Sequence, residues 1–327
     1  MARSNDVWQC ALIDTIRYKV RKYPIIHRPA HRLVCLLRCA KSFVNWYLFK
    51  LSFKLNHNGL NTTEQRPKKI KASLTSYPGR IEIVPYAIAS LLNQTMKPDK
   101  IILWLGEDKF PDKKLPKIFD ELEECGVEVK FCPEDLKPHT KYFYTMKEYP
   151  EDIVITFDDD YIYSRHIIKI LYESYIQHPS CVTGIYCTKM TFNHDGNIKS
   201  IADWEYAYVN SKGHESHTYF LAGVGGVLYP PHSLHPEVFN VEAMKKLCPK
   251  ADDVWLKFME VMNNTRAVPA SNGNGVMGNL IPYSQEEALH YFNDHQGGND
   301  IQIKALLEEY NTRPEGRTLL EMMREDA

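Results

Sequence analysis

The sequence predicts an α/β fold in which helices flank a mostly parallel sheet, with a basic helical extension at the N-terminus. From residue 70 onward, short apolar segments alternate with helical ones, and this alternation is typical of parallel sheets covered on both faces. The 327 residues are 44% hydrophobic and 25% charged, an ordinary globular balance that supports one large or two smaller cores. Intrinsic disorder is therefore not the expectation.

The N-terminal segment differs from the rest of the chain in charge. Residues 1–57 contain eleven Lys and Arg but only two acidic residues, a charge of about +9 in a chain whose formal net charge is -1. The apolar stretch at 33–53 is interrupted by Arg38, Lys41 and Lys50, so it falls short of the ~20 apolar residues of a membrane span. Its basic and aromatic residues suit the interface of an anionic membrane, and a helical lid packed on the body is the alternative.

Composition also suggests a compartment and domain boundaries. Eight scattered cysteines without C-x-x-C spacing indicate reduced thiols, and no signal peptide is recognised, so we expect a cytoplasmic protein at the inner face of the cell membrane. The polar stretch at 56–69 predicts a linker. We expect a basic N-terminal segment and linker at 1–66, a main domain at 67–311 with halves 67–190 and 191–311, and a tail at 312–327.

The main domain contains five segments with strand character. They are rich in β-branched, aromatic and other apolar residues and lie at 70–77, 100–106, 127–132, 152–157 and 181–187. The segments at 85–94 and 114–125 predict two of the intervening helices. No G-x-G-x-x-G follows the first strand and no P-loop motif is present, which argues against a nicotinamide enzyme or an ATPase.

Two polar loops follow predicted strands, TSYPGR at 75–80 and DDD at 158–160. Open sheets of this kind bind ligands beyond the carboxyl ends of their strands, so both loops should border one crevice. Hard divalent cations prefer carboxylate oxygens, and residues one apart at a strand end point to the same side. We therefore expect Asp158 and Asp160 to bind Mn²⁺ or Mg²⁺ while Asp159 faces elsewhere. An EF-hand is excluded, because it would require Gly and Glu where Tyr163 and Lys169 stand.

Four motifs give the chain a resemblance to a known family. SLTSYPGR at 73–80, IASLLNQTMKPDKIILWL at 88–105, ITFDDD at 155–160, and GVGGVLYPP at 223–231 followed by ADDVWL at 251–256 occur in this order. Together they resemble a glycosyltransferase of the GT-A fold, of the family-2-like type found in bacterial polysaccharide and lipopolysaccharide assembly. The resemblance spans about residues 70–260 and implies a Rossmann-like nucleotide-binding half.

The resemblance also implies roles for individual residues. In the family, GVGGVLYPP corresponds to an acceptor-side loop whose glycines approach the donor sugar. The residues implied in donor binding are Thr75, Ser76, Tyr77, Arg80, Lys141, Asp159, Gly225 and Gly226. The implied metal ligands are Asp158, Asp160 and His295, with His290 as the other candidate histidine, and the implied catalytic pair is Asp252 and Asp253, with Asp253 as general base.

These roles lead to an expected function. The enzyme would transfer a sugar from a nucleotide-sugar donor, UDP-linked in this reading, to a hydroxyl of a glycan or glycolipid, with inversion and with Mn²⁺ or Mg²⁺ as cofactor. The other expected partner is an anionic membrane surface, and nucleic acid is not expected. The alternatives are a sugar-phosphate nucleotidylyltransferase, for which SYPGR is a poor phosphate loop, and a non-catalytic carbohydrate-binding scaffold.

Overall fold

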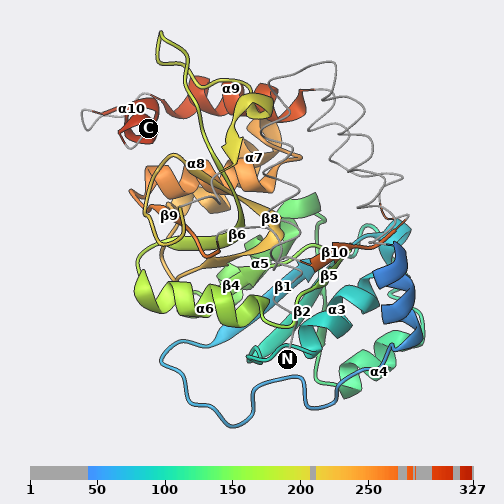
Figure 1. The fold of residues 1–327 in the computed structure, drawn as a ribbon. Helices are drawn as coiled ribbons and strands as arrows, with labels where there is room; N and C mark the ends of the chain where they lie inside the picture. The colour runs from blue at the N-terminus through green and yellow to red at the C-terminus, as the bar shows by residue number, and fades with distance from the viewer. Residues whose placement is uncertain are drawn as a thin grey trace, which may run out of the picture.

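The computed structural model describes residues 43–206, 211–271, 278–282, 284, 297–311 and 317–325, and all structural statements refer to these (Figure 1). The strands are β1 Ile70–Thr75, β2 Lys100–Gly106, β3 Glu128–Cys132, β4 Ile153–Thr156, β5 Tyr161–Tyr163, β6 Val182–Lys189, β7 Glu205–Tyr206, β8 Tyr219–Tyr229, β9 Ala267–Pro269 and β10 Gly278–Leu280. The helices are α3 Val84–Leu92, α4 Ile118–Glu124, α5 Thr140–Glu148, α6 Ile167–Gln177, α7 Val241–Leu247, α8 Asp252–Met262, α9 Gly298–Tyr310 and α10 Leu319–Arg324, and residues 43–51 are also helical.

The main sheet has eight strands in the order β3-β2-β1-β4-β8-β6-β7, with β9 paired to β6. The pairs β3-β2, β2-β1, β1-β4 and β6-β9 are parallel, whereas β8 runs antiparallel to both β4 and β6. The predicted mixed α/β architecture with a mostly parallel sheet is confirmed. The five predicted strands correspond to β1, β2, β3, β4 and β6.

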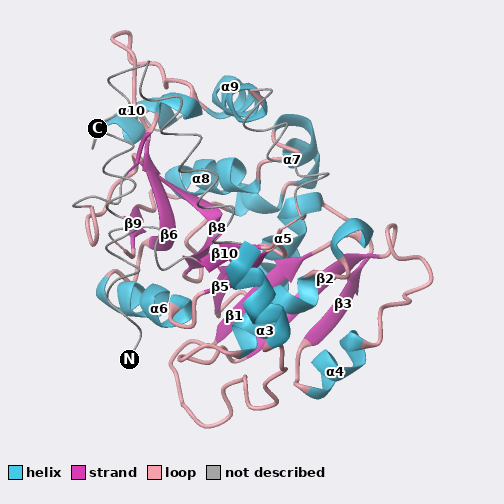
Figure 2. Cartoon of the chain, turned by 45° about the vertical axis from the view of Figure 1, so that its right-hand side comes forward, coloured by secondary structure: helices cyan, strands magenta, loops and turns pink. Residues whose placement is uncertain are grey.

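Helices cover both faces of this sheet (Figure 2). Alternate residues of β1 explain why: Ile70, Ala72 and Leu74 are buried in a core with α3, α4 and α6, whereas Ser73 points to the other face and bonds to α5. A second core joins α5 and α7–α10 to β6 and β8. The period-two pattern of β1 therefore supplies both faces with buried side chains.

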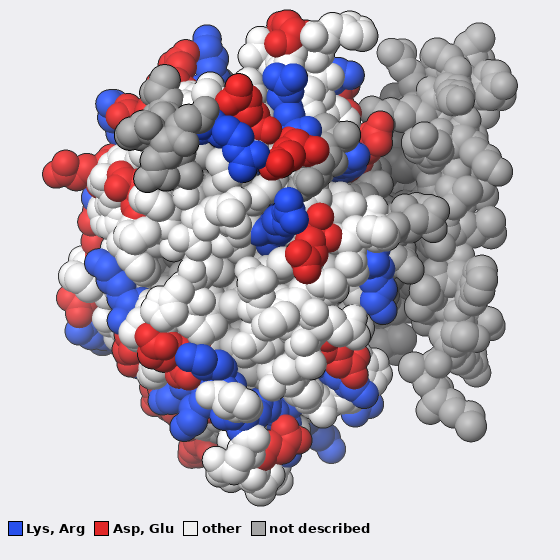
Figure 3. Space-filling model, turned by 90° about the vertical axis from the view of Figure 1, so that its left-hand side faces the viewer, with Lys and Arg blue, Asp and Glu red and all other residues white. Residues whose placement is uncertain are grey.

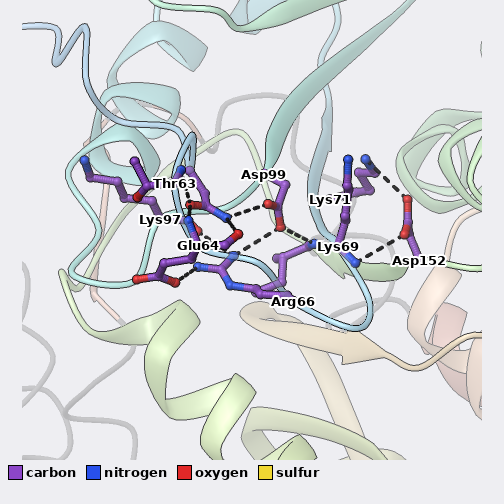
Figure 4. Close-up of polar contacts among 10 residues, drawn as sticks. Thr63, Glu64, Arg66, Lys69, Lys71, Lys97, Asp99 and Asp152 are labelled. Atoms are coloured by element: carbon purple, nitrogen blue, oxygen red, sulfur yellow. Dashed lines mark hydrogen bonds and ion pairs between the residues drawn. The ribbon is translucent and has the colours of Figure 1, made fainter.

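Residues 56–66, predicted as part of a linker, pack against the main domain instead. The Arg66 guanidinium lies 3.1 Å from Asp99 and its side chain is only 5% exposed (Figure 4). The other Asp99 oxygen accepts a hydrogen bond from Asn61, and Asp99 also caps the N–H of Ile70 at the start of β1. The polar composition that suggested a linker reflects side chains that bond to the domain.

The 43–51 helix lies beside α3, as the blue helix of Figure 1 shows. The Trp46 and Phe53 rings stand 4.6 and 4.8 Å from the Tyr86 ring of α3. The helix expected in the stretch at 33–53 is thus observed for 43–51, and residues 1–42 lie outside the described part. Among the described helices, none combines the length and the apolar character that crossing a bilayer requires.

Candidate functional site

The three consecutive aspartates lie where β4 meets the loop after β1. Because β1 and β4 are parallel neighbours, their carboxyl ends lie at one edge of the sheet. Ser76, just after β1, donates a 2.5 Å hydrogen bond to Asp159, and Arg80 of the same loop donates one of 2.6 Å to the other Asp159 oxygen. The structure therefore joins two predicted site segments that are about eighty residues apart.

Arg80 is the cation of this part of the site. Its guanidinium lies 3.1 Å from Asp160 as well as contacting Asp159, and its Nε donates to the carbonyl of Ser284. Burial lowers the pKa of Arg80, but the charges of Asp159 and Asp160 outweigh this and raise it further above its ordinary value. Tyr77, whose ring centroid is 5.6 Å from the guanidinium carbon, flanks the group.

Lys141 of α5 links the aspartates to a second acidic pair. Its Nζ lies 2.7 Å from Asp158 and 2.9 Å from Asp252, and the side chain is 4% exposed. Burial lowers the pKa of Lys141, but the charges of Asp158, Asp252 and Asp253 overcome this and raise it well above its ordinary value. Lys141 is therefore a buried cation and not a solvated surface lysine.

A buried polar network fixes the helix that carries Lys141. The Ser73 hydroxyl donates to the backbone carbonyl of Lys141 at 2.5 Å and lies 2.6 Å from the Thr145 hydroxyl. The indole N–H of Trp104, in β2, donates to Thr145 at 2.7 Å. Two strands thus hold α5 by groups whose loss would leave buried polar atoms unpaired.

Asp252 and Asp253 open helix α8. One Asp253 oxygen accepts a 3.0 Å hydrogen bond from the N–H of Gly223, in β8. Burial is the first cause that raises the pKa of Asp253 well above its ordinary value, and the charges of Asp252 and Asp158 add to it. Burial likewise raises the pKa of Asp252, and Lys141 opposes that rise. An acid with a raised pKa is suited to proton transfer near neutral pH.

Within the described residues, five carboxylates surround two cationic side chains. Asp158 and Asp252 contact Lys141, Asp159 and Asp160 contact Arg80, and Asp253 lies at the edge of this set. Crowded carboxylates repel one another unless a cation is shared among them. Their hard oxygen donors suit Mg²⁺ or Mn²⁺, which takes one or two carboxylates together with phosphate oxygens. No described group of three or more His, Cys, Asp and Glu side chains could hold a metal by itself.

The predicted orientation of the three aspartates was wrong. Asp158 and Asp160 were expected on one side with Asp159 elsewhere, but Asp159 and Asp160 share Arg80 while Asp158 faces Lys141. The reason is that β4 ends at Thr156, so Asp158 lies beyond the strand, Asp159 and Asp160 form a turn, and the three do not alternate as strand residues do.

The glycines of GVGGVL also differ from the prediction, because the motif lies inside β8 and not in a loop. A Cβ on Gly225 would come within 2.7 Å of the backbone N of Tyr186, and one on Gly226, whose φ is +78°, would meet the Phe157 ring at 2.8 Å. These two glycines serve strand and core packing. Gly223 faces the site instead, where a Cβ would lie 3.1 Å from Asp253 and 3.3 Å from the Nζ of Lys141.

The remaining predicted residues have varied placements. The Thr75 hydroxyl donates to the carbonyl of Trp104 within the sheet, so it is already used in strand pairing. His295 and His290 lie outside the described residues.

Sequence reasoning missed Gly223 and Tyr163. The Tyr163 hydroxyl accepts the N–H of Asp158 at 2.7 Å and so helps to shape the turn of the three aspartates. The run of aromatic and β-branched residues in YIY, directly after DDD, favours a strand and is the signal that could have placed this tyrosine beside the turn.

Comparisons with known proteins complete the description. No family model and no curated protein matches the chain. Among solved structures, the chain is similar to the mannosyltransferase PcManGT from Pyrobaculum calidifontis, solved with GDP-Man and Mn²⁺, at 8% identity, a TM-score of 0.47, and coverage of 89% of this chain and 78% of that one. It is also similar to a 4-diphosphocytidyl-2C-methyl-D-erythritol synthase from Anaerococcus prevotii, at 13% identity and a TM-score of 0.41, with 70% of this chain and 99% of that one covered. At these identities and scores, neither likeness bears on the site residues or on the reaction.

Proposed function

We propose that this protein is a metal-dependent glycosyltransferase that moves a sugar from a nucleotide-sugar donor to a hydroxyl of a glycan or glycolipid. The observation that carries the proposal is the meeting of two acidic groups at one cation. Asp158, which follows β4, and Asp252, which opens α8, both contact Lys141. Asp253, the proposed proton acceptor, directly follows Asp252 at the start of α8, so a diphosphate-binding carboxylate and a proton acceptor would lie close together, as transfer from a nucleotide sugar requires.

The donor would lie along the loop after β1. In this proposal Ser76, Tyr77 and Arg80 border the nucleoside. Asp159 holds Ser76 and Arg80 in place by accepting a hydrogen bond from each. One oxygen of Asp158 contacts Lys141 and one oxygen of Asp160 contacts Arg80. In this proposal the two carboxylates would together also hold Mn²⁺ or Mg²⁺, which when bound neutralises charge on the diphosphate leaving group. Lys141, held beside Asp158, adds a fixed positive charge in a buried environment where it is weakly screened.

Asp253 is the proposed general base. Its carboxylate would accept the proton of the acceptor hydroxyl as that oxygen forms the new bond to the anomeric carbon and the bond to the nucleoside diphosphate breaks. Attack opposite the leaving group inverts the anomeric configuration. The raised pKa of Asp253 brings its basicity closer to working pH, and the Gly223 N–H fixes one oxygen so that the other can face the acceptor.

The proposal is tested by thermal unfolding of the full chain with a panel of nucleotide sugars, each with Mn²⁺, with Mg²⁺ and with a chelator. Binding to the folded state at one hundred times the dissociation constant adds about 2.7 kcal/mol of stability. We expect one nucleotide class to stabilise the protein only when metal is present, and the same panel identifies whether that nucleotide is UDP. Absence of stabilisation by every nucleotide sugar in the presence of metal would contradict the proposal.

The contacts of Arg80 weigh against the nucleotidylyltransferase alternative. That activity needs a loop after the first strand whose basic side chains are free to meet a triphosphate. In this chain the basic residue of SYPGR is bound to Asp159 and Asp160. Release of pyrophosphate from a nucleoside triphosphate and a sugar phosphate would favour the alternative.

A further inference from the structure

The 43–51 helix presents its apolar face to solvent. The exposed fractions are 47% for Phe43, 55% for Val44, 57% for Tyr47, 58% for Leu48 and 71% for Leu51. Positions i, i+1, i+4, i+5 and i+8 form one continuous stripe of a helix. A surface helix usually turns such a stripe inward, so this one needs an explanation.

The opposite face of the helix is attached to the domain. Trp46 packs edge-on against Tyr86, and Asn45 donates a 2.9 Å hydrogen bond to Asn279 of β10. Ser52 caps the last turn by donating to the Leu48 carbonyl. The orientation of the helix is therefore fixed by specific contacts, and these contacts keep the apolar stripe outward.

Charge indicates which partner the stripe suits. Lys50 and Lys54 lie in or just after the helix, and residues 1–57 as a whole carry about +9. A second copy of the chain would bring the same positive charge to the contact and be repelled, whereas an anionic lipid surface attracts it by roughly 1 kcal/mol per basic residue. By contrast, the face of the domain drawn in Figure 3 mixes Lys and Arg with Asp and Glu.

We propose that the apolar stripe of the 43–51 helix docks the protein on an anionic lipid bilayer. Tyr47, Leu48 and Leu51 enter the interfacial region, while the neighbouring basic residues contact lipid headgroups. Aromatic and aliphatic side chains beside lysines are the composition that binds this interface. Docking of this kind needs no membrane-spanning helix.

The 43–51 helix is connected to the candidate site through β10 and β5. Asn279, which pairs with Asn45, belongs to β10, and β10 pairs with β5 directly after Asp160. The N–H of Ile281 donates to the carbonyl of Asp160 at 2.8 Å. A bilayer bound to the helix therefore lies next to the edge of the site formed by β5 and β10.

The test is co-sedimentation of the full chain with vesicles of phosphatidylcholine alone and of phosphatidylcholine mixed with phosphatidylglycerol, without metal or nucleotide. We expect binding to the anionic vesicles only, weakened when salt shortens the Debye length from about 10 Å at 0.1 M to about 3 Å at 1 M. Leu48→Glu/Leu51→Glu should lower the partition coefficient about tenfold or more. Both substitutions are at exposed positions, so the thermal unfolding midpoint should stay near that of the wild type.

The matched control is Ile176→Glu/Ile301→Glu, which places the same charge change on apolar residues that are 59% and 61% exposed on other helices. This variant should bind vesicles like the wild type. Equal vesicle binding by both double variants, or no binding by the wild type, would overturn the proposal. Dimerisation that Leu48→Glu/Leu51→Glu abolishes, without vesicle binding, would overturn it in favour of a contact between copies. Because the assay contains no nucleotide, failure of the proposed enzymatic function would leave its outcome unchanged.

Discussion

Asp253 combines three properties of a general base: a half-buried carboxylate, one oxygen fixed by the Gly223 N–H, and a raised pKa. Asp253→Asn keeps the shape of the side chain and removes its ability to accept a proton. We expect turnover to fall by about 10²–10⁴-fold, because general base catalysis contributes on that scale. Donor and metal affinity, measured by calorimetry, should stay near the wild-type values.

The neighbouring acid supplies the comparison for this test. Asp252→Asn removes a carboxylate that faces Lys141 at 2.9 Å, so its effect should fall mainly on the free energy of unfolding and not on turnover. Near-normal turnover of Asp253→Asn would show that Asp253 is not the general base. A product with retained anomeric configuration would contradict the assignment as well.

The raised pKa of Asp253 also has a consequence for stability. A carboxyl whose folded pKa lies above its ordinary value of 3.8 binds a proton more readily in the folded state. Its contribution to the free energy of unfolding is therefore fully present at low pH and is lost as the pH rises through the folded pKa. Asn resembles the protonated acid at every pH. In urea unfolding of the metal-free protein, the free energy of unfolding of Asp253→Asn should increase relative to that of the wild type as pH rises. A difference between the two free energies that does not change with pH would contradict this.

The two kinds of glycine in β8 should respond differently to alanine. Gly223→Ala places a methyl group 3.1 Å from Asp253 and 3.3 Å from the Nζ of Lys141, both of which are side-chain atoms. It should lower turnover with little change in the midpoint of unfolding. Gly225→Ala places the methyl 2.7 Å from a backbone atom of β6, so it should lower the midpoint by several degrees. The reverse pattern would show that Gly225, as the sequence motif suggested, is the residue at the site.

These residues also mark the limit of prediction from sequence. The motif DDD predicted a binding site because three adjacent anions need cations nearby. Which cations they contact depends on the conformation of the chain after β4. Arg80 comes from another loop and Lys141 from a helix, and neither pairing is encoded in local spacing. The sequence motif favoured Gly225 and Gly226 over Gly223, because the packing of Gly225 against Tyr186 and of Gly226 against Phe157 is visible only in three dimensions.

At the scale of elements, the position of Lys141 depends on how α5 is attached. Thr145→Val removes the acceptor of the Trp104 indole N–H and a partner of Ser73, at a cost of about 1–3 kcal/mol for unpaired buried groups. We expect a lower free energy of unfolding together with weaker metal-dependent donor binding, because the helix that carries Lys141 loses its anchor.

A matched control separates these effects. Thr183→Val breaks a similar buried hydroxyl pair, in which Ser174 of α6 lies 2.7 Å from Thr183 of β6. It should lower stability to a similar degree without changing donor affinity measured below the unfolding transition. If both variants bind the donor like the wild type, the network is structural only.

The elements themselves were the most predictable part of the fold. The strands β1, β2 and β4 are buried on both faces, so they appear in the sequence as short apolar runs between turn residues. The segment at 56–66 was not predictable in this way, because its polar residues resemble a linker until Arg66 is seen against Asp99.

For the whole molecule, the sheet order explains how distant segments reach one place. The strands β1, β4 and β8 are adjacent, and the helices α5 and α8 pack on the same face of them. The loop after β1, Lys141, the three aspartates and the start of α8 therefore meet at one edge. The positions of TSYPGR and DDD after predicted strands predicted that these two loops meet, whereas the individual ion pairs follow from tertiary packing.

The most direct test of the central claim is release of nucleoside diphosphate from the nucleotide sugar that stabilises the wild type, measured with acceptor glycans and with Mn²⁺, Mg²⁺ or a chelator. The account predicts release by the wild type that the chelator abolishes, and loss of most of this turnover in Asp160→Asn, with circular dichroism showing an intact fold. Full activity of Asp158→Ala/Asp160→Ala in excess chelator would contradict the claim that these carboxylates hold a metal on the donor diphosphate.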